Sequence, residues 1–342
     1  MKKKWLWISL ASLLATGLVI LICTFFGAAD ITIKETLMVL IYHIFGGFEE
    51  EVKAIGSQST IIWMLRFPRS ILAFLVGGGL ALCGGVYQAI FKNPMADPFI
   101  LGISSGAAFG ATIGILLNFS ASFMGMNSTS LLAFAGALLS IFFVYNIAKV
   151  GRQANTTSLL LCGTAVNQFL TALISFAMLM FSNEMKKIYF WTLGSFSSKG
   201  WDHVITVLPY VVIGMIIILI FAKELDIMVL GDETATRFGV DVEKNKRILF
   251  LVTSLVMAAC VSVSGIIGFV GLIAPHVIRL IVGPSHKKLL PLSFVLGGVV
   301  LCICDTIARS VINAEVPVGI VTAIVGAPFF VYLLRARNTE VV

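Results

Sequence analysis

The stretch Arg66–Ile90 reads RFPRSILAFLVGGGLALCGGVYQAI, and it decides the fold class of the chain. After its second arginine it continues for about 20 residues without a charge, which is the length that a helix needs to cross a membrane. Five glycines lie within that run: Gly77, Gly78, Gly79, Gly84 and Gly85. Small residues let neighbouring helices approach closely. The stretch therefore predicts a spanning helix inside a dense helical bundle.

The composition of the whole chain agrees with that prediction. Of its 342 residues, 58% are hydrophobic and 12% are charged. A soluble domain is about 45–50% apolar and about 25% charged, so a soluble protein is excluded. We expect no nucleic-acid partner from the net charge of +7, because in a membrane protein the positions of the charges matter more. The six cysteines lie in apolar runs without metal-ligand spacing, so we expect no metal and no cofactor.

Ten apolar runs are long enough to be spanning helices. The predicted fold class is an all-α integral membrane protein, a polytopic bundle of about ten transmembrane helices forming one transmembrane domain over residues 1–342. The division between the seventh and eighth runs is the least distinct, and one continuous run there would reduce the count to nine. The predicted helices are 5–28, 66–90, 98–118, 129–149, 157–182, 204–222, 247–263, 265–282, 289–312 and 317–334.

The first apolar run, from Trp5 to Ala29, exceeds the 7–15 residues or so of a signal-peptide core, so we interpret it as an uncleaved helix. With the N-terminus inside, the inner loops carry about twice as many lysines and arginines as the outer ones. This bias predicts a multi-pass protein of the cytoplasmic membrane with both termini cytoplasmic. In the third helix Gly102, Gly106, Gly110 and Gly114 recur every four residues, which predicts one closely packed face.

Three arginines are predicted on the outer side, against the general bias. Arg66 and Arg69 lie three residues apart and share a helix face, and Arg309 lies near the outer end of the ninth helix. Arginines at a membrane–water interface often have no specific partner and simply extend the charged end of the side chain into water. Three guanidinium groups at the mouth of a bundle can also receive carboxylates from a partner protein.

Asp305 is the acid that we place well inside a span, one turn before Arg309. An intramembrane acid is a candidate proton site, which would suit an ion-coupled secondary transporter. We favour a structural ion pair between Asp305 and Arg309. Asn167 and Gln168 are mid-span amides, which we interpret as interhelical hydrogen bonders or pathway lining. No paired catalytic residues indicate an intramembrane enzyme.

The charged segment at about 223–247 reads KELDIMVLGDETATRFGVDVEKNKR. Its apolar spacing predicts two short helices around Gly231 and Gly239, with Asp232 as a cap. The chain contains no GxxxxGK[ST] motif, so it does not hold ATP phosphates in a P-loop. A loop of this length is usually functional or disordered, and its apolar spacing favours order.

These motifs resemble the permease subunits of ATP-binding-cassette importers for ferric siderophores, haem and vitamin B12, the FecCD type. Five segments spread over residues 66–334 carry the resemblance, whereas the outer loop 29–62 matches no family pattern. They are RFPRS, GGGLALCGGVYQAIFKNPMADPFILGISSGAAFGA, LGDETATRFGV, SGIIGFVGLIAPHVIRLIVGPSHKKLLP and DTIARSVINAEVPVGIVTAIVGAPFFVYLL.

The resemblance implies ten helices per subunit and a pathway between two permease subunits, identical or similar. It implies that an extracytoplasmic binding protein places acidic residues on Arg66, Arg69 and Arg309. It implies a transport subunit and not an enzyme, with ATP hydrolysed by a cytoplasmic ATPase dimer. Its cargo would be a ferric siderophore first, with haem or cobalamin as alternatives. The residues expected to contact the ATPase are Leu230, Gly231, Asp232, Ala235, Phe238 and Gly239.

Overall fold

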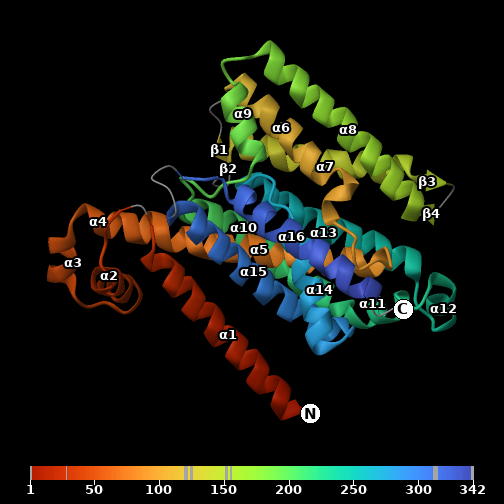
Figure 1. Cartoon of the computed structure of the whole chain (residues 1–342), viewed down its shortest axis with the longest axis horizontal. Coiled ribbons are helices and arrows are strands. Elements are labelled where there is room, and N and C mark those ends of the chain that lie inside the picture. Colours follow the sequence, from red (N-terminus) through yellow and green to blue (C-terminus); the bar gives the residue numbers. More distant parts are fainter. Residues whose placement is uncertain are drawn as a thin grey trace.

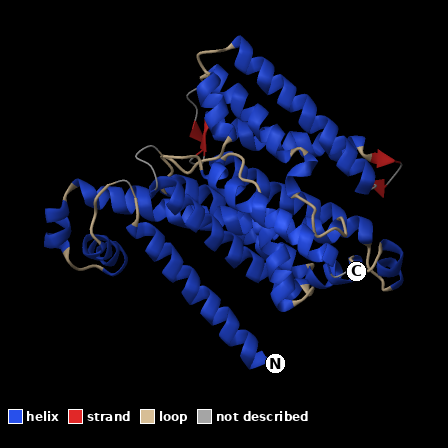
Figure 2. Ribbon diagram, in the orientation of Figure 1, coloured by secondary structure: helices blue, strands red, loops and turns tan. Residues whose placement is uncertain are grey.

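The computed structural model of the chain describes residues 2–27, 29–118, 122–123, 126–150, 153–154, 156–310 and 315–339, most of them helical (Figure 2). Its larger helices are α1 (Lys2–Phe25), α5 (Phe67–Ile90), α6 (Ile103–Leu117), α7 (Ser128–Ile147), α8 (Thr156–Met180), α10 (Trp201–Ile220), α13 (Val242–Ser264), α14 (Val270–Val282), α15 (His286–Ser310) and α16 (Val318–Thr339).

The remaining elements are short. The short helices are α2 (Ile33–Phe45), α3 (Glu49–Ile55), α4 (Ser57–Thr60), the π-helix η1 (Ile61–Arg66), the 3₁₀ turn η2 (Pro98–Leu101), α9 (Met185–Thr192), α11 (Ala222–Met228) and α12 (Asp232–Arg237). Two antiparallel hairpins pair β1 (Ser122–Phe123) with β2 (Met126–Asn127), and β3 (Lys149–Val150) with β4 (Gln153–Ala154).

The ten larger helices correspond one to one with the ten predicted spans. By length and composition, six helices of the described chain can cross a membrane, and four shorter apolar helices account for the others. The predicted division between the seventh and eighth helices is confirmed, because α13 ends at Ser264 and Gly265 follows with φ 71°. The all-α membrane fold is therefore confirmed.

Two predicted helix starts lie about five residues too early, and the predicted start of the seventh span at 247 lies five residues too late, because α13 begins at Val242. The third span does not begin as an α-helix at residue 98. Asp97 accepts a hydrogen bond from the Phe99 amide at 2.8 Å and starts the 3₁₀ turn η2. Gly102 then adopts φ 79°, and α6 begins only after it. The eighth span starts at Val270 and not at 265, because residues 265–269 are not helical and both Gly265 (φ 71°) and Phe269 (φ 69°) have positive φ.

Helix α5 lies at the centre of the bundle (Figure 1). It continues the turns of α4 and η1, and the most apolar part of this combined helix is 94% buried. Helices α1, α10, α13, α14 and α15 contact it, while α6 to α9 form a second group that meets the first through α13. Figure 1 places α2, α3 and α4 at one end of the molecule, and α11 and α12 at the opposite end.

Glycines allow the helices to pack at backbone distance, as the sequence predicted. On α5, a Cβ added to Gly78 would lie 2.6 Å from the Phe294 ring of α15. On the predicted face of α6, Gly106 and Gly110 lie against the backbone of α7 at Gly136 and Leu132. Gly102 contributes differently, because it lies in the turn before α6 and its carbonyl accepts a hydrogen bond from Ser140 Oγ at 2.8 Å.

Gly84→Ala is expected to destabilise the bundle. An added Cβ would overlap the Gly271 carbonyl of α14, which is backbone and cannot rotate away. Overpacking of this kind costs about 1–3 kcal/mol. Thermal unfolding of the purified protein in detergent would measure the loss. Gly268→Ala is the matched control, since its added Cβ meets no atom within 4 Å in the described chain. Equal stability of the two variants would contradict the packing described.

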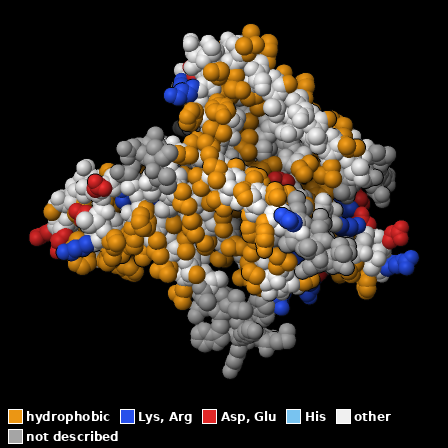
Figure 3. Space-filling view, viewed as in Figure 1, with side chains coloured by type: hydrophobic (Ala, Val, Ile, Leu, Met, Phe, Trp, Pro, Cys, Tyr) orange, Lys and Arg blue, Asp and Glu red, His pale blue; other side chains and the backbone are white. Residues whose placement is uncertain are grey.

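The surface separates apolar and charged regions (Figure 3). Hydrophobic side chains cover the middle of the visible face, and charged side chains gather toward its ends. Helix α8 is the most exposed of the six long spans, because only 17% of its most apolar stretch is buried inside the structure. Large side chains such as Leu161, Phe169 and Leu179 project from it, each more than 60% exposed. Such a helix suits contact with lipid or with a second membrane subunit.

Candidate functional sites at the two ends of the bundle

At one end of the bundle the structure brings together the three arginines singled out in the sequence. Arg66 and Arg69 lie at the start of α5, and Arg309 lies at the end of α15. Two acids complete the group, Asp305 on α15 and Glu315 just before α16. We call these five residues the arginine cluster. The arginines are only 5%, 7% and 4% exposed, so they are internal groups in this conformation.

Arg69, and not Arg309, is the main partner of Asp305. Arg69 Nη2 donates to Asp305 Oδ1 at 2.9 Å, and Arg69 Nε donates to Oδ2 at 3.0 Å, which is a two-pronged ion pair. Arg309 Nε lies 3.7 Å from Asp305 Oδ2. The predicted Asp305–Arg309 pair is therefore the weaker contact. The close packing of α5 on α15 brings Arg69 to a residue 236 positions away, which helical spacing cannot reveal.

Arg66 and Arg309 also hold the end of α1. Arg66 donates to the carbonyls of Phe25, at 3.2 Å, and Ala29. Arg309 Nη2 donates to the carbonyl of Cys23 at 2.6 Å. The last carbonyls of a helix have no partner within the helix, and a cation there also complements the helix dipole. The two arginines therefore fasten α1 to the start of α5 and the end of α15.

Glu315 is the member of the cluster that sequence reasoning missed. Its Oε1 lies 3.0 Å from Arg69 Nη1, and its side chain is 40% exposed. Burial opposes its ionisation, but the Ser197 hydroxyl and the charge of Arg69 outweigh burial and hold the pKa of this carboxyl below its usual value. The signal available was an acid in the short loop between α15 and α16, six residues after Arg309.

At the opposite end, α11 and α12 form the two short helices predicted around Gly231; we call residues 222–240 the twin-helix segment. Asp226 fastens α11 to α15, because its Oδ1 accepts the His286 backbone N–H at 2.7 Å and contacts His286 Nδ1 at 2.6 Å. Asp232 fastens α12, with Oδ1 2.7 Å from Lys92 Nζ and Oδ2 2.7 Å from Lys246 Nζ.

The predicted capping role of Asp232 was wrong. Gly231, with φ 119°, occupies the position before α12, and Asp232 is the first residue of the helix. Its carboxylate is therefore free to bridge the two lysines. Burial opposes ionisation of Asp232, but hydrogen bonds from Lys246 and Lys92 outweigh burial and hold its pKa below the usual value.

We predict that Asp232→Asn loosens α12. A carboxyl with a depressed pKa stabilises the fold above its unfolded value, about 3.9, and loses that contribution as the pH falls through the lower folded value. The bridge should therefore be intact at pH 5 and at pH 8. Amide hydrogen exchange in α12 should rise several-fold in Asp232→Asn at both values, but not in the control Glu233→Gln on the same helix. Unchanged exchange in Asp232→Asn would contradict the bridge.

The twin-helix segment presents apolar side chains to solvent. Leu230 is 66% exposed and Phe238 is 70% exposed, and Gly239 beside Phe238 is also exposed. Gly231 and Asp232 are half-buried. Ala235 is fully buried, so it seats α12 on the bundle and cannot be part of an exposed contact surface. Leu230 and Phe238 are thus large apolar side chains exposed on a segment that ion pairs tie to the bundle, which makes the segment a candidate contact surface.

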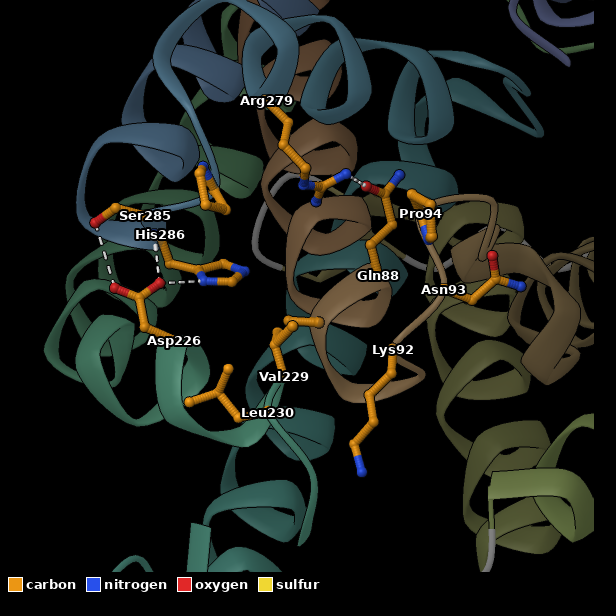
Figure 4. Close-up of a pocket in the computed structure, with 12 residues that line it drawn as sticks. Gln88, Lys92, Asn93, Pro94, Asp226, Val229, Leu230, Arg279, Ser285 and His286 are labelled. Carbon is orange, nitrogen blue, oxygen red and sulfur yellow. Dashed lines mark hydrogen bonds and ion pairs between the residues drawn. The ribbon is translucent and has the colours of Figure 1, made fainter. Parts of the chain in front are cut away.

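A pocket of about 500 Å³ opens beside the twin-helix segment (Figure 4). Val229 and Leu230 line one wall, and Lys92 lies across from them at the end of α5. Deeper in, Arg279 Nη1 donates to Gln88 Oε1 at 2.8 Å. The segment thus contributes Val229, Leu230 and the acid Asp226 to the lining, and the bundle contributes the bases Lys92 and Arg279.

Asn167 and Gln168 join neither end site. Both lie on α8, where Asn167 is half-buried and Gln168 is exposed. The Thr171 hydroxyl donates to the Asn167 backbone carbonyl at 2.7 Å. The two amides are thus polar groups on the most exposed of the long spans, where their predicted pathway or interface role stays a prediction.

A many-helix membrane bundle with a tied-down, partly apolar segment at one end and an arginine cluster at the other defines a polytopic transport subunit. The family profile of the FecCD transport family matches residues 14–336, and the chain belongs to this family. It is a permease of the ATP-binding-cassette importer class, an integral protein of the cytoplasmic membrane. The ion-coupled carrier built on Asp305 is thereby overturned, and the bidentate pair with Arg69 gives Asp305 a structural role instead.

Three relatives and one solved structure illustrate the similarity. The chain is 45% identical to the cobalamin import permease BtuC of Halobacterium salinarum, over 83% of this chain and 76% of that protein. It is 38% identical to the iron(3+)-hydroxamate permease FhuG of Bacillus subtilis (81% and 84%) and 35% identical to the hemin permease HmuU of Yersinia pestis (82% and 84%). A metal-chelate type ABC transporter solved in an inward-facing conformation matches with a TM-score of 0.81 at 27% identity, covering 96% of this chain and 99% of that one.

Proposed function

We propose that this chain moves a bulky metal chelate, a ferric siderophore, across the cytoplasmic membrane as one of two permease subunits of an importer. It makes and breaks no bond in its cargo. ATP binding and hydrolysis by a cytoplasmic ATPase dimer change the position of the twin-helix segment, and the bundle then alternates access between the two sides. The observation that carries this proposal is the twin-helix segment itself, ordered, fastened to three spans and apolar on its exposed side.

The ATPase contact would use Leu230, Phe238 and Gly239, with Gly231 and Asp232 shaping the turn between the two short helices. Large exposed apolar side chains at the centre of an interface carry much of its binding energy. The adjacent pocket, lined by Val229 and Leu230, lies beside this contact surface and would be part of it. The positive-inside bias supports a cytoplasmic position for this end of the bundle.

The opposite end would receive the extracytoplasmic binding protein, with its carboxylates directed to Arg66, Arg69 and Arg309. Because all three arginines are internal in this conformation, docking requires their present contacts to loosen. The second permease subunit, identical or similar, would cover the exposed side of α8, where Asn167 and Gln168 lie among large apolar residues.

The cargo is proposed from the chemistry named for the relatives. The relatives from Bacillus subtilis and Yersinia pestis are named for iron(3+)-hydroxamate and hemin, which supports an iron chelate. Cobalamin is the second candidate, favoured by the 45% identity to a cobalamin permease. Haem remains within the same class of bulky metal-bearing ligands.

Uptake of radiolabelled ferric siderophore by cells with and without this gene tests the cargo, with unlabelled haem and cobalamin as competitors. We expect deletion to abolish the uptake and neither competitor to reduce it in intact cells. If siderophore uptake survives deletion while cobalamin uptake is lost, the siderophore assignment is wrong and the second candidate replaces it.

A further inference from the structure

The guanidinium of Arg69 divides its hydrogen bonds between an inner and an outer acid. Nε and Nη2 bind Asp305, whose side chain is 1% exposed. Nη1 binds Glu315, whose side chain is 40% exposed. The bond to Asp305 is closed off from solvent. The bond to Glu315 lies on the solvent-facing side of Arg69, where a molecule arriving from outside would make its first contact.

In the described chain, neither of the other two arginines has a half-exposed acid as a hydrogen-bonded partner, although the exposed Asp30 lies near Arg66. Arg66 binds backbone carbonyls at the end of α1. Arg309 binds the Cys23 carbonyl and lies close to the same buried Asp305. Among the residues that the structure describes, Glu315 is thus the half-exposed carboxylate on the three arginines. It occupies the position that a carboxylate from a docking partner would take.

Glu315 also lies close to the start of a spanning helix, so that its displacement would affect that helix. The Val316 amide donates to the Ala308 carbonyl of α15 at 3.1 Å, and α16 begins at Val318. The chain that carries the carboxylate therefore leads within three residues into a span. A carboxylate leaving Arg69 would loosen the start of that span and not a remote loop.

We propose that Glu315 acts as an internal substitute for the partner's carboxylate: it binds Arg69 while the permease is undocked, and the binding protein must displace it to dock. Glu315 thereby sets the affinity of the outer surface for its partner, an acidic surface on the substrate-binding protein. This proposal rests on the proposed docking function of the arginine cluster. Its distinctive consequence is that removing an acid from the permease strengthens binding of an acidic partner.

The test uses the intact transporter with its ATPase in lipid nanodiscs. The probe is the binding protein that stimulates ATP hydrolysis by this complex, and its Kd is measured for wild type, Glu315→Gln, Glu184→Gln and Arg69→Lys. We expect Glu315→Gln to bind about threefold to tenfold more tightly, the range that competition by one half-exposed charged hydrogen bond supports. Glu184→Gln, which removes an acid paired with Lys187 elsewhere on the predicted outer side, should change the Kd by less than twofold.

A second readout does not need the partner. Phenylglyoxal labels accessible guanidinium groups, and mass spectrometry of the labelled chain reports Arg69 by itself. Labelling of Arg69 should rise several-fold in Glu315→Gln and stay unchanged in Glu184→Gln.

The outcomes separate the two proposals. Arg69→Lys keeps the positive charge but loses the forked guanidinium that binds a carboxylate with two hydrogen bonds. If this variant weakens docking while Glu315→Gln leaves the Kd unchanged or raises it, docking on Arg69 stands and the role of Glu315 is overturned. If Arg69→Lys binds like wild type, the docking function fails and the inference about Glu315 fails with it. Tighter binding by Glu315→Gln, with Arg69 more reactive, supports both.

Discussion

Asp305→Ala is expected to lower the stability of the permease by about 3–5 kcal/mol, the cost of breaking a buried ion pair by removing one partner. The substitution leaves the guanidinium groups of Arg69 and Arg309 facing each other in a site where both are less than 8% exposed. It also removes the bond that joins α5 and α15 within the arginine cluster. Chemical or thermal unfolding in detergent, together with the amount of folded protein in the membrane, measures the loss.

Two variants control this prediction. Glu315→Gln removes the half-exposed acid of the same cluster and should cost less than about 1 kcal/mol. The double variant Arg69→Gln with Asp305→Asn removes both charges of the buried pair and should recover much of the stability lost in Asp305→Ala, since the charge of Arg69 no longer lacks its buried partner. A variant Asp305→Ala that unfolds like wild type would show that the buried pair has no structural role.

Phe238→Ala and Leu230→Ala are expected to weaken association with the ATPase by about 2 kcal/mol each, roughly thirtyfold, and to reduce transport accordingly. Both side chains are about two-thirds exposed in the isolated chain, so their loss should leave the stability of the permease itself unchanged. Co-purification with the ATPase and ATP-dependent uptake measure the effect.

The control lies on the same segment. Glu233→Ala truncates an exposed charged residue between the two apolar ones and should leave association within about 0.5 kcal/mol of wild type. If Phe238→Ala and Leu230→Ala associate as tightly as Glu233→Ala, the apolar surface of the twin-helix segment is not the ATPase contact.

The ten-helix organisation could be predicted because a span is a local property of the sequence. An uncharged run such as the one after Arg69 has the length of a membrane crossing whatever surrounds it. The glycines on α6 were also readable, since residues four apart share a helix face. The start of α14 at Val270 was predicted five residues early, because where a helix resumes after a positive-φ glycine depends on what it packs against.

The partners within each site could not be predicted. Helical spacing suggested Arg309 as the partner of Asp305, whereas packing of α5 on α15 supplies Arg69 from 236 residues away. Asp232 resembled a cap, whereas its position lets it bridge Lys92 and Lys246. Ala235 lay in a motif of contact residues but faces the core. Each of these outcomes depends on tertiary packing, which a single sequence records only indirectly.

The most direct test is accumulation of radiolabelled ferric siderophore in proteoliposomes that contain this chain, its ATPase and its binding protein. We predict accumulation that requires ATP and both partners, that persists when the proton gradient is dissipated, and that Phe238→Ala reduces. Accumulation of cobalamin but not of the iron chelate would contradict the proposed cargo. Accumulation of either ligand without ATP, driven by a proton gradient, would contradict the proposed mechanism as a whole.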